Sequence, residues 1–90
     1  MSASRSVTIC NQRGLHARAS VRFLNEAANY DAEVSVARDG EAVRADSALD
    51  LMMLGAGPGA CITISAEGPE AAAAVDALAD LVERRFDEDS

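Results

Sequence analysis

Ninety residues suffice for one small domain and leave no room for a catalytic domain beside a regulatory one. The formal net charge is −7, all eight cationic side chains are arginine, and only three residues are aromatic. Nucleic-acid modules need a basic face and aromatic stacking platforms, so this composition argues against them and favours partners with basic surfaces. The N-terminal residues lack the apolar core of a signal peptide, and no run approaches a membrane span. We therefore expect a cytoplasmic protein without membrane insertion.

The first part of the chain predicts a strand, a loop and a helix. Residues 6–10 alternate apolar and polar side chains like a half-buried strand, and residues 11–14 then break the pattern. Residues 17–29 carry apolar side chains at helical spacing. The buried stripe of this helix is expected to contain Val21, Leu24 and Ala28, widened by Phe23 and Ala27.

A hairpin and a short helix are predicted next. Residues 33–37 alternate again, and Asp39-Gly40 is a strong tight-turn signal before residues 41–45. Ser47 is followed three positions later by Asp50, which fits a capping box and predicts a short helix ending at Gly55. The glycine-rich turn after it lacks the Gly-Lys-Ser/Thr ending of a phosphate loop and leads into a strand, so we interpret it as a turn only.

The short helix has more apolar side chains than two turns can bury on one face. They are Leu49, Leu51, Met52, Met53 and Leu54. Some should therefore be exposed as a docking patch, for which methionine is suited by its flexible thioether. The alternative is that all five lie in the core. The predicted docking surface spans both helices and comprises Ala17, Val21, Ala48, Leu49, Met52 and Met53.

The C-terminal third predicts a strand at residues 61–66 and a helix opened by Gly68-Pro69-Glu70, where proline is tolerated and glutamate favours the helix dipole. We expect residues 1–90 to form a single domain in which 87–90 are a frayed acidic tail. Cys10 and Cys61 fall in predicted strands and are interpreted as small buried thiols, although a disulfide remains open if those strands are neighbours.

The predicted order is β-α-β-β-α-β-α, in the α+β class. Four strands with one apolar face need a cover, and two long amphipathic helices suffice to cover one side.

The only histidine, His16, lies where the loop passes into the first helix. Backbone N–H groups of a first helical turn lack intrahelical partners and carry a partial positive charge, so those of Ala17, Arg18 and Ala19 could bind an anion there. The same charge disfavours imidazolium, and a ring with a reference pKa of about 6.5 should be largely neutral and nucleophilic. A ring nitrogen could then accept a phosphoryl group, and the Arg18 guanidinium could reach its oxygens.

The alternative for His16 is a solvated or capping residue. A metal site on it is not expected, because companion ligands are missing nearby in the sequence, and no cofactor is implied.

Gly14-Leu15-His16-Ala17-Arg18 resembles the active-site signature of HPr, the histidine-containing phosphocarrier family of the phosphoenolpyruvate-dependent phosphotransferase system. The similarity runs from Val7 to about Leu81 and includes residues 64–68. It implies an open-faced β-sandwich, with a four-stranded antiparallel sheet and three helices on one face. It also implies phosphorylation of His16 on Nδ1 with Arg18 as electrostatic partner. The implied phosphoryl donor is enzyme I, and the implied acceptors are enzyme IIA-type proteins.

The chain departs from the family signature at Ala19, where the family usually has proline. Alanine adds one potential N–H donor to the first turn, so we expect a slightly better-solvated or better-bound phosphate. The alanine resembles HPr-like proteins of the nitrogen-related branch, and the choice between sugar transport and nitrogen regulation stays open.

Ser47 aligns with a serine that an HPr kinase/phosphorylase modifies in part of the family. A phosphate there would place up to two negative charges beside the apolar patch and weaken docking. The alternative is a purely capping role, since Asp46 and residues 48–50 differ from the kinase-target pattern. Two functional hypotheses follow: a phosphocarrier that uses His16, and a regulatory binding module switched by phosphorylation of His16 or Ser47.

Overall fold

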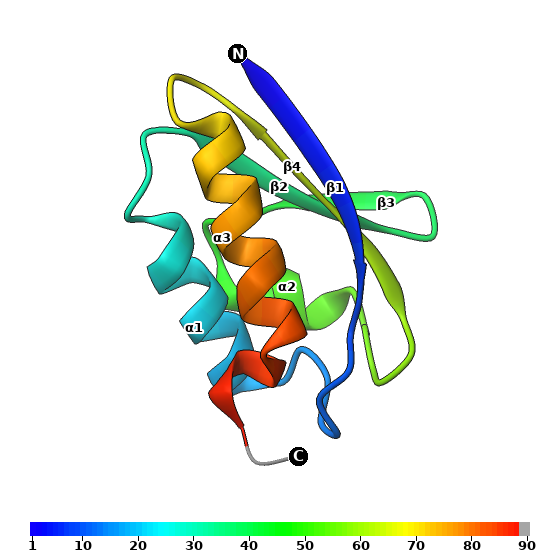
Figure 1. Cartoon of the computed structure of the whole chain (residues 1–90). Coiled ribbons are helices and arrows are strands. Elements are labelled where there is room, and N and C mark those ends of the chain that lie inside the picture. The colour runs from blue at the N-terminus through cyan, green and yellow to red at the C-terminus, as the bar shows by residue number, and fades with distance from the viewer. Residues whose placement is uncertain (89–90) are drawn as a thin grey trace.

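The structure is a computed structural model that describes residues 1–88, and its elements follow the predicted β-α-β-β-α-β-α order (Figure 1). The elements are β1 (Ser2–Thr8), α1 (Ala17–Ala27), β2 (Glu33–Arg38), β3 (Glu41–Arg44), α2 (Ala48–Met53), β4 (Cys61–Glu67), α3 (Ala71–Glu83) and a 3-10 turn, η1 (Arg85–Asp87). Across this part of the chain, no helix has both the length and the apolar character needed to cross a membrane.

The four strands form one antiparallel sheet in the order β1-β4-β2-β3. Side chains alternate across a strand, and the register places Val7 of β1 opposite Ile62 and Val36 of β2 opposite Ile64. These four side chains are buried, so they define the inner face of the sheet. Figure 1 shows the helices on that one side, which confirms the predicted open-faced architecture.

The first helix presents a different face to the core than the sequence predicted. Its buried residues are Ala19, Ser20, Phe23 and Ala27, whereas Val21 is exposed, Ala28 is exposed and Leu24 is half-buried. Residues two positions apart point about 200° away from each other around a helix, so Phe23 and Val21 cannot both face inward. Phe23 is fully buried, and Val21 therefore lies on the exposed face.

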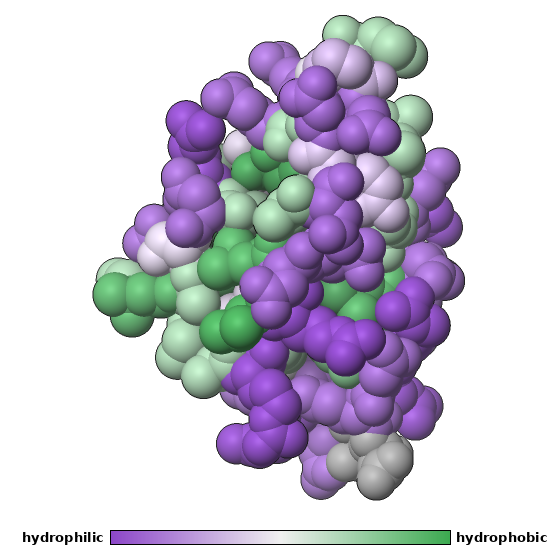
Figure 2. Space-filling model, turned by 90° about the vertical axis from the view of Figure 1, so that its left-hand side faces the viewer, coloured by the Kyte–Doolittle hydropathy of each residue, from purple (hydrophilic) through white to green (hydrophobic). Residues whose placement is uncertain are grey.

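The second helix, α2, is too short to bury all of its apolar side chains. Leu51 and Leu54 lie in the core, whereas Leu49 is 64% exposed and Met53 is 73% exposed, and Met52 is also exposed. The alternative that all five apolar residues are core is therefore wrong. Figure 2 shows hydrophobic side chains gathered along one flank of the molecule, next to a largely hydrophilic surface.

The structure corrects the predicted ends of several elements. The first strand spans Ser2–Thr8 rather than residues 6–10. Its N-terminal half pairs with β4 but is mostly polar and exposed, so the sequence there shows no alternation of apolar and polar residues that would predict a strand. The helix α1 ends at Ala27 rather than residue 29, and α2 ends at Met53.

The two thiols are exposed and free, so the prediction that they are buried is wrong. Cys10 lies beyond the end of β1, and its Sγ donates to the carbonyl oxygens of Val82 and Glu83 at the end of α3. Cys61 begins β4 opposite Thr8, at a position that alternates with the buried Ile62 and therefore faces outward.

The predicted frayed tail is also wrong for residues 87 and 88, while residues 89–90 lie outside the described part of the chain. Phe86 is buried, and Asp87 contacts Arg22 and Arg84. Glu88 contacts His16. The aromatic anchor and these polar contacts, which no local sequence pattern reveals, hold the segment against the helices.

Candidate functional site

The loop before α1 is fixed by the segment that follows α2. The Leu15 N–H donates to the Ala56 carbonyl at 2.9 Å. Gly14 has a φ of +65°, and a Cβ there would lie 2.4 Å from the Ala56 oxygen. The buried Ser20 hydroxyl donates to the Leu15 carbonyl at 3.2 Å and ties the loop to the helix. These contacts determine where the next residue, His16, meets the helix.

His16 is the N-cap residue of α1 and lies at the junction of loop and helix where the sequence placed it. Its Nδ1 accepts a hydrogen bond from the Arg18 backbone N–H at 3.2 Å, and its carbonyl oxygen accepts one from the Ser20 N–H at 2.9 Å. Nδ1 therefore faces the N-terminal end of the helix, where free N–H groups and the positive end of the helix dipole are located.

The other ring nitrogen contacts a carboxylate from the far end of the chain. Nε2 of His16 lies 2.5 Å from Oε2 of Glu88. The second carboxylate oxygen, Oε1, accepts from Nδ2 of Asn11 at 3.0 Å, and Asn11 is completely buried. The side chains of His16 and Glu88 are only 14% and 18% exposed. The described structure thus shields most of the imidazole.

These contacts fix the proton position on a neutral His16 ring. A nitrogen that accepts from an N–H carries no proton, and a nitrogen that contacts a carboxylate donates one. Nδ1 therefore has the free lone pair, and Nε2 bears the hydrogen that Glu88 accepts. The sequence-based expectation considered the positive end of the helix alone and did not include a carboxylate on Nε2.

Glu88 remains a carboxylate despite its partial burial. Burial alone would raise the pKa of this carboxyl group, but hydrogen bonds from Asn11 and His16, together with the charge of Arg18, lower the pKa below its ordinary value.

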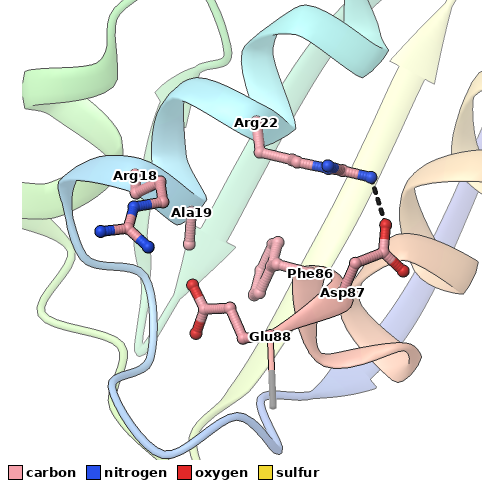
Figure 3. Close-up of a pocket in the computed structure, with 6 residues that line it drawn as sticks. All are labelled: Arg18, Ala19, Arg22, Phe86, Asp87 and Glu88. Carbon is pink, nitrogen blue, oxygen red and sulfur yellow. Dashed lines mark hydrogen bonds and ion pairs between the residues drawn. The ribbon is translucent and has the colours of Figure 1, made fainter. Parts of the chain in front are cut away.

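A hollow of about 390 Å³ lies between α1 and the C-terminal turn that carries Glu88 (Figure 3). It is lined by Arg18, Ala19, Arg22, Phe86, Asp87 and Glu88. Arg22 is paired with Asp87, whereas the exposed Arg18 guanidinium makes no ion pair within residues 1–88. The Arg18 guanidinium thus lines the hollow without an ion-pair partner among the described residues, and its charge acts on the nearby Glu88 carboxylate. No group of three or more histidine, cysteine or acidic side chains in the same part of the chain could hold a metal ion.

Comparison with known proteins decides the family. The family described as PTS HPr component phosphorylation site matches residues 3–84. The chain is 44% identical to phosphocarrier protein NPr of Shewanella violacea, over 96% of this chain and 94% of the relative. It is 43% identical to phosphocarrier protein HPr of Cupriavidus necator, over 93% and 94%. This chain belongs to the HPr family.

Solved structures agree with this assignment. The crystal structure of HPr-C-His from Thermoanaerobacter tengcongensis superposes with a TM-score of 0.92 at 34% identity and covers 98% of this chain and 99% of that chain. An HPr from Bacillus anthracis has a TM-score of 0.83 at 35% identity, over 88% of this chain and 94% of that chain. The four-stranded sheet and its covering helices are therefore the HPr fold.

Within this HPr fold, the predicted docking residues lie on two helices that pack against each other, α1 and α2. Ala17 and Val21 are exposed on α1, and Leu49, Met52 and Met53 are exposed on α2, where Ala48 is partly buried. We call the four large members, Val21, Leu49, Met52 and Met53, the apolar patch.

Ser47 is the N-cap of α2, and its hydroxyl oxygen accepts from the Asp50 backbone N–H at 3.4 Å. The predicted serine cap is thereby confirmed.

Two residues of the site were not found from the sequence. Asn11 and Glu88 are separated by 77 positions, and neither belongs to a motif or a periodic stripe. Asn11 could have been noticed because it lies in the loop that breaks the strand pattern, where asparagine side chains commonly hydrogen-bond nearby backbone groups. For Glu88 the sequence offered no local signal.

Proposed function

We propose that this protein carries a phosphoryl group on Nδ1 of His16, accepts it from phosphorylated enzyme I and passes it to an enzyme IIA-type protein in the cytoplasm. The observation that supports this most directly is the direction of the Nδ1 lone pair, which faces the Arg18 backbone N–H in the N-terminal turn of α1. The Arg18 guanidinium makes no ion pair within residues 1–88 and adds a positive charge to the same turn. Phosphoryl transfer depends mostly on positioning and charge stabilisation, and this arrangement supplies both.

The transfer step needs no further reactant. The Nδ1 lone pair attacks the phosphorus, the bond from phosphorus to its donor atom on enzyme I breaks, and the electron pair of that bond returns to the donor atom. The hydrogen bond from the Arg18 N–H to Nδ1 is lost in this step, which frees that donor for a phosphate oxygen. We propose that the N–H groups of Ala17 and Ala19 contribute in the same way.

The apolar patch gives the carrier a surface for its partners. Val21 is on α1, the helix that His16 caps, and Leu49, Met52 and Met53 extend the surface over α2. We propose that Ala17 and Ala48 complete this docking surface. A patch of flexible methionine and leucine side chains can contact successive partners, because it can repack against surfaces of different shape.

A second candidate function is a binding module switched by phosphorylation. The observation that favours it is the position of Ser47, which caps the helix that carries most of the apolar patch. A phosphate from an HPr kinase/phosphorylase would be tolerated at the helix N-terminus yet would add negative charge beside the docking residues.

The deciding experiment is the intact mass of the protein after incubation with phosphoenolpyruvate and enzyme I. The carrier hypothesis predicts one added phosphate that brief acid treatment removes and that His16→Ala lacks. Enzyme I is tested in parallel on an established HPr carrier. If that control is phosphorylated and the folded protein is not, the carrier hypothesis is wrong and the binding module is the better account.

A further inference from the structure

The structure brings a carboxylate and a buried amide to the side of His16 that points away from the helix. Glu88 uses both oxygens, one for Nε2 of His16 at 2.5 Å and one for the Asn11 amide at 3.0 Å. Asn11 is fixed in turn by donating to the Gly14 carbonyl at 2.9 Å, in the loop that leads to His16. The carboxylate is therefore held by the same loop that positions the ring.

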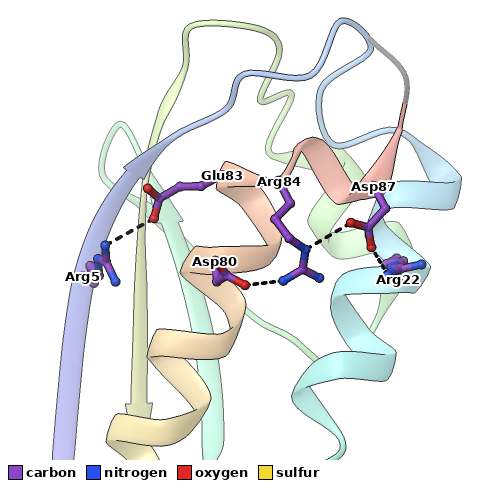
Figure 4. A network of polar contacts seen from close by, with 6 residues as sticks. All are labelled: Arg5, Arg22, Asp80, Glu83, Arg84 and Asp87. Carbon is purple, nitrogen blue, oxygen red and sulfur yellow. Dashed lines mark hydrogen bonds and ion pairs between the residues drawn. The ribbon is translucent and has the colours of Figure 1, made fainter.

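The turn that carries Glu88 is anchored independently of the histidine. Arg85, Phe86 and Asp87 all have a positive φ, between 54° and 60°, which side chains other than glycine disfavour. The segment is held in this conformation by the buried Phe86 ring and by Asp87, which contacts Arg84 and Arg22 (Figure 4). Strained backbone persists where the surroundings enforce it, and such positions concentrate at functional sites.

We propose that Glu88 is a positioning residue for His16 that holds the hydrogen on Nε2 and counters the positive charge that spreads over the ring during phosphoryl transfer. This inference rests on the proposed phosphoacceptor function of His16. When Nδ1 bonds to phosphorus, the ring that still carries the Nε2 hydrogen gains positive charge. Glu88 lies directly against that hydrogen and is positioned to stabilise this state.

The contact between Glu88 and His16 resembles the carboxylate–histidine pair of serine proteases. In serine proteases an aspartate accepts a hydrogen bond from one nitrogen of the catalytic histidine, fixes its tautomer and stabilises its cationic form without taking the proton. Here the proton likewise stays on Nε2 throughout, while the bond between phosphorus and Nδ1 forms and the bond between phosphorus and the donor atom breaks. The ring becomes positively charged as it accepts the phosphoryl group and loses that charge as it gives the group up, so Glu88 should accelerate the acceptance step and stabilise the phosphorylated ring.

The Asn11 amide makes the glutamine variant informative. One oxygen of Glu88 accepts from Asn11 and the other accepts from His16, so a carboxylate satisfies two donors at once. In Glu88→Gln only one oxygen remains, and the amide NH₂ must face either the Asn11 NH₂ or Nε2. Facing Nε2, it would favour the hydrogen on Nδ1, which is the wrong tautomer for attack.

The test combines ring NMR with transfer kinetics on the intact chain. Nitrogen-15 and proton spectra of the His16 ring should show a protected, downfield Nε2 hydrogen in the natural protein that is lost in Glu88→Ala. With enzyme I, kcat should fall roughly 10- to 100-fold in Glu88→Ala, by analogy with the loss typical when the carboxylate partner of a metal-ligating histidine is removed, and at least as far in Glu88→Gln. A matched control is Glu83→Gln, since Glu83 pairs with Arg5 on the surface and has no contact with His16.

An unchanged ring spectrum, an unchanged kcat or a rise in KM alone for Glu88→Ala would each overturn the proposal, the last because it would indicate a docking role. The proposed function fails separately, if the natural protein receives no phosphate on His16 at all. The ring spectrum is recorded without enzyme I, so it tests the Glu88 contact whichever way the phosphorylation result falls.

Discussion

Asp87 of the C-terminal turn contacts the guanidinium of Arg22 on α1 across 65 positions of the sequence (Figure 4). Arg22 lies within two helical turns of His16, the residue that caps the same helix. The contact therefore places the turn against the part of α1 that carries the candidate site. Arg84 binds both Asp87 and Asp80, so the turn is also fastened to α3.

Acid should release this turn from the helices. A hydrogen bond from Arg84 lowers the pKa of Asp87, and the pKa of Glu88 is also lowered, below ordinary values of 3.8 and 4.5. These two carboxyl groups therefore bind protons more readily in the unfolded chain than in the folded protein. The stabilisation from both groups is therefore complete above about pH 4.5 and is lost as the pH falls through the lowered values.

NMR resonances of Phe86 and the His16 ring should thus change together in acid, before global unfolding. The contribution of the exposed Asp87 should shrink with added salt. Resonances that stay constant down to global unfolding would contradict this prediction.

Gly14→Ala should destabilise the protein and disturb the site. The new Cβ would lie 2.4 Å from a backbone oxygen, and the residue would have to keep a φ of +65°. We expect a loss of at least about 1–2 kcal/mol, measured by urea unfolding, from the left-handed conformation alone. Gly40→Ala is the matched control, because its φ is +86° but no atom lies within 4 Å of the added Cβ. Equal losses in the two variants would show that the contact with Ala56 is not tight.

Phe86→Ala should show whether the C-terminal turn is anchored through the core. Removing a buried phenylalanine ring typically costs about 3–5 kcal/mol, so the free energy of unfolding should fall by roughly that amount. The Nε2 hydrogen of His16 should also exchange faster with water, since Glu88 loses its support. If Phe86→Ala unfolds with the same free energy as the natural protein, the ring is not part of the core. As a control, Phe86→Leu should have a free energy of unfolding between those of the natural protein and Phe86→Ala.

Leu49→Glu and Met53→Glu should weaken binding to enzyme I without destabilising the fold. Both side chains are largely exposed, and surface substitutions usually change stability by less than about 0.5 kcal/mol. Leu51→Ala on the same helix is the contrast, because Leu51 is fully buried and its truncation should cost about 2–5 kcal/mol. Calorimetric titration and urea unfolding measure the two effects. If the glutamate variants bind normally, the patch is not the docking surface.

The parts of the site that depend on neighbouring residues could be predicted from the sequence. The place of His16 at the start of α1 followed from a strand pattern, a break and a helical pattern, and the Ser47 cap followed from its spacing to Asp50. Glu88 could not be predicted, since its contact with His16 spans 72 positions and depends on the direction of a left-handed turn.

The orientation of α1 was harder to predict than its existence. Val21 and Phe23 are both apolar, and composition alone gives no preference between their faces. The small Ala19 and Ala27 lie one turn on either side of Phe23 and are buried with it. The choice of this face depends on packing against α2 and α3, which a helical pattern does not encode.

The place of β4 between β1 and β2 has a consequence for how the protein folds. Within residues 1–88, β1 pairs with β4 alone, about sixty positions later in the sequence, as in the pair of Ser2 with Glu67. Such distant pairing carries a large loop-closure cost and makes folding slow relative to helical bundles of similar length. The loop that carries His16 follows β1 directly. The segment around Ala56, which hydrogen-bonds this loop, leads into β4. A partly folded chain would therefore display the histidine without its oriented lone pair, and the chemistry would begin only once the sheet had closed.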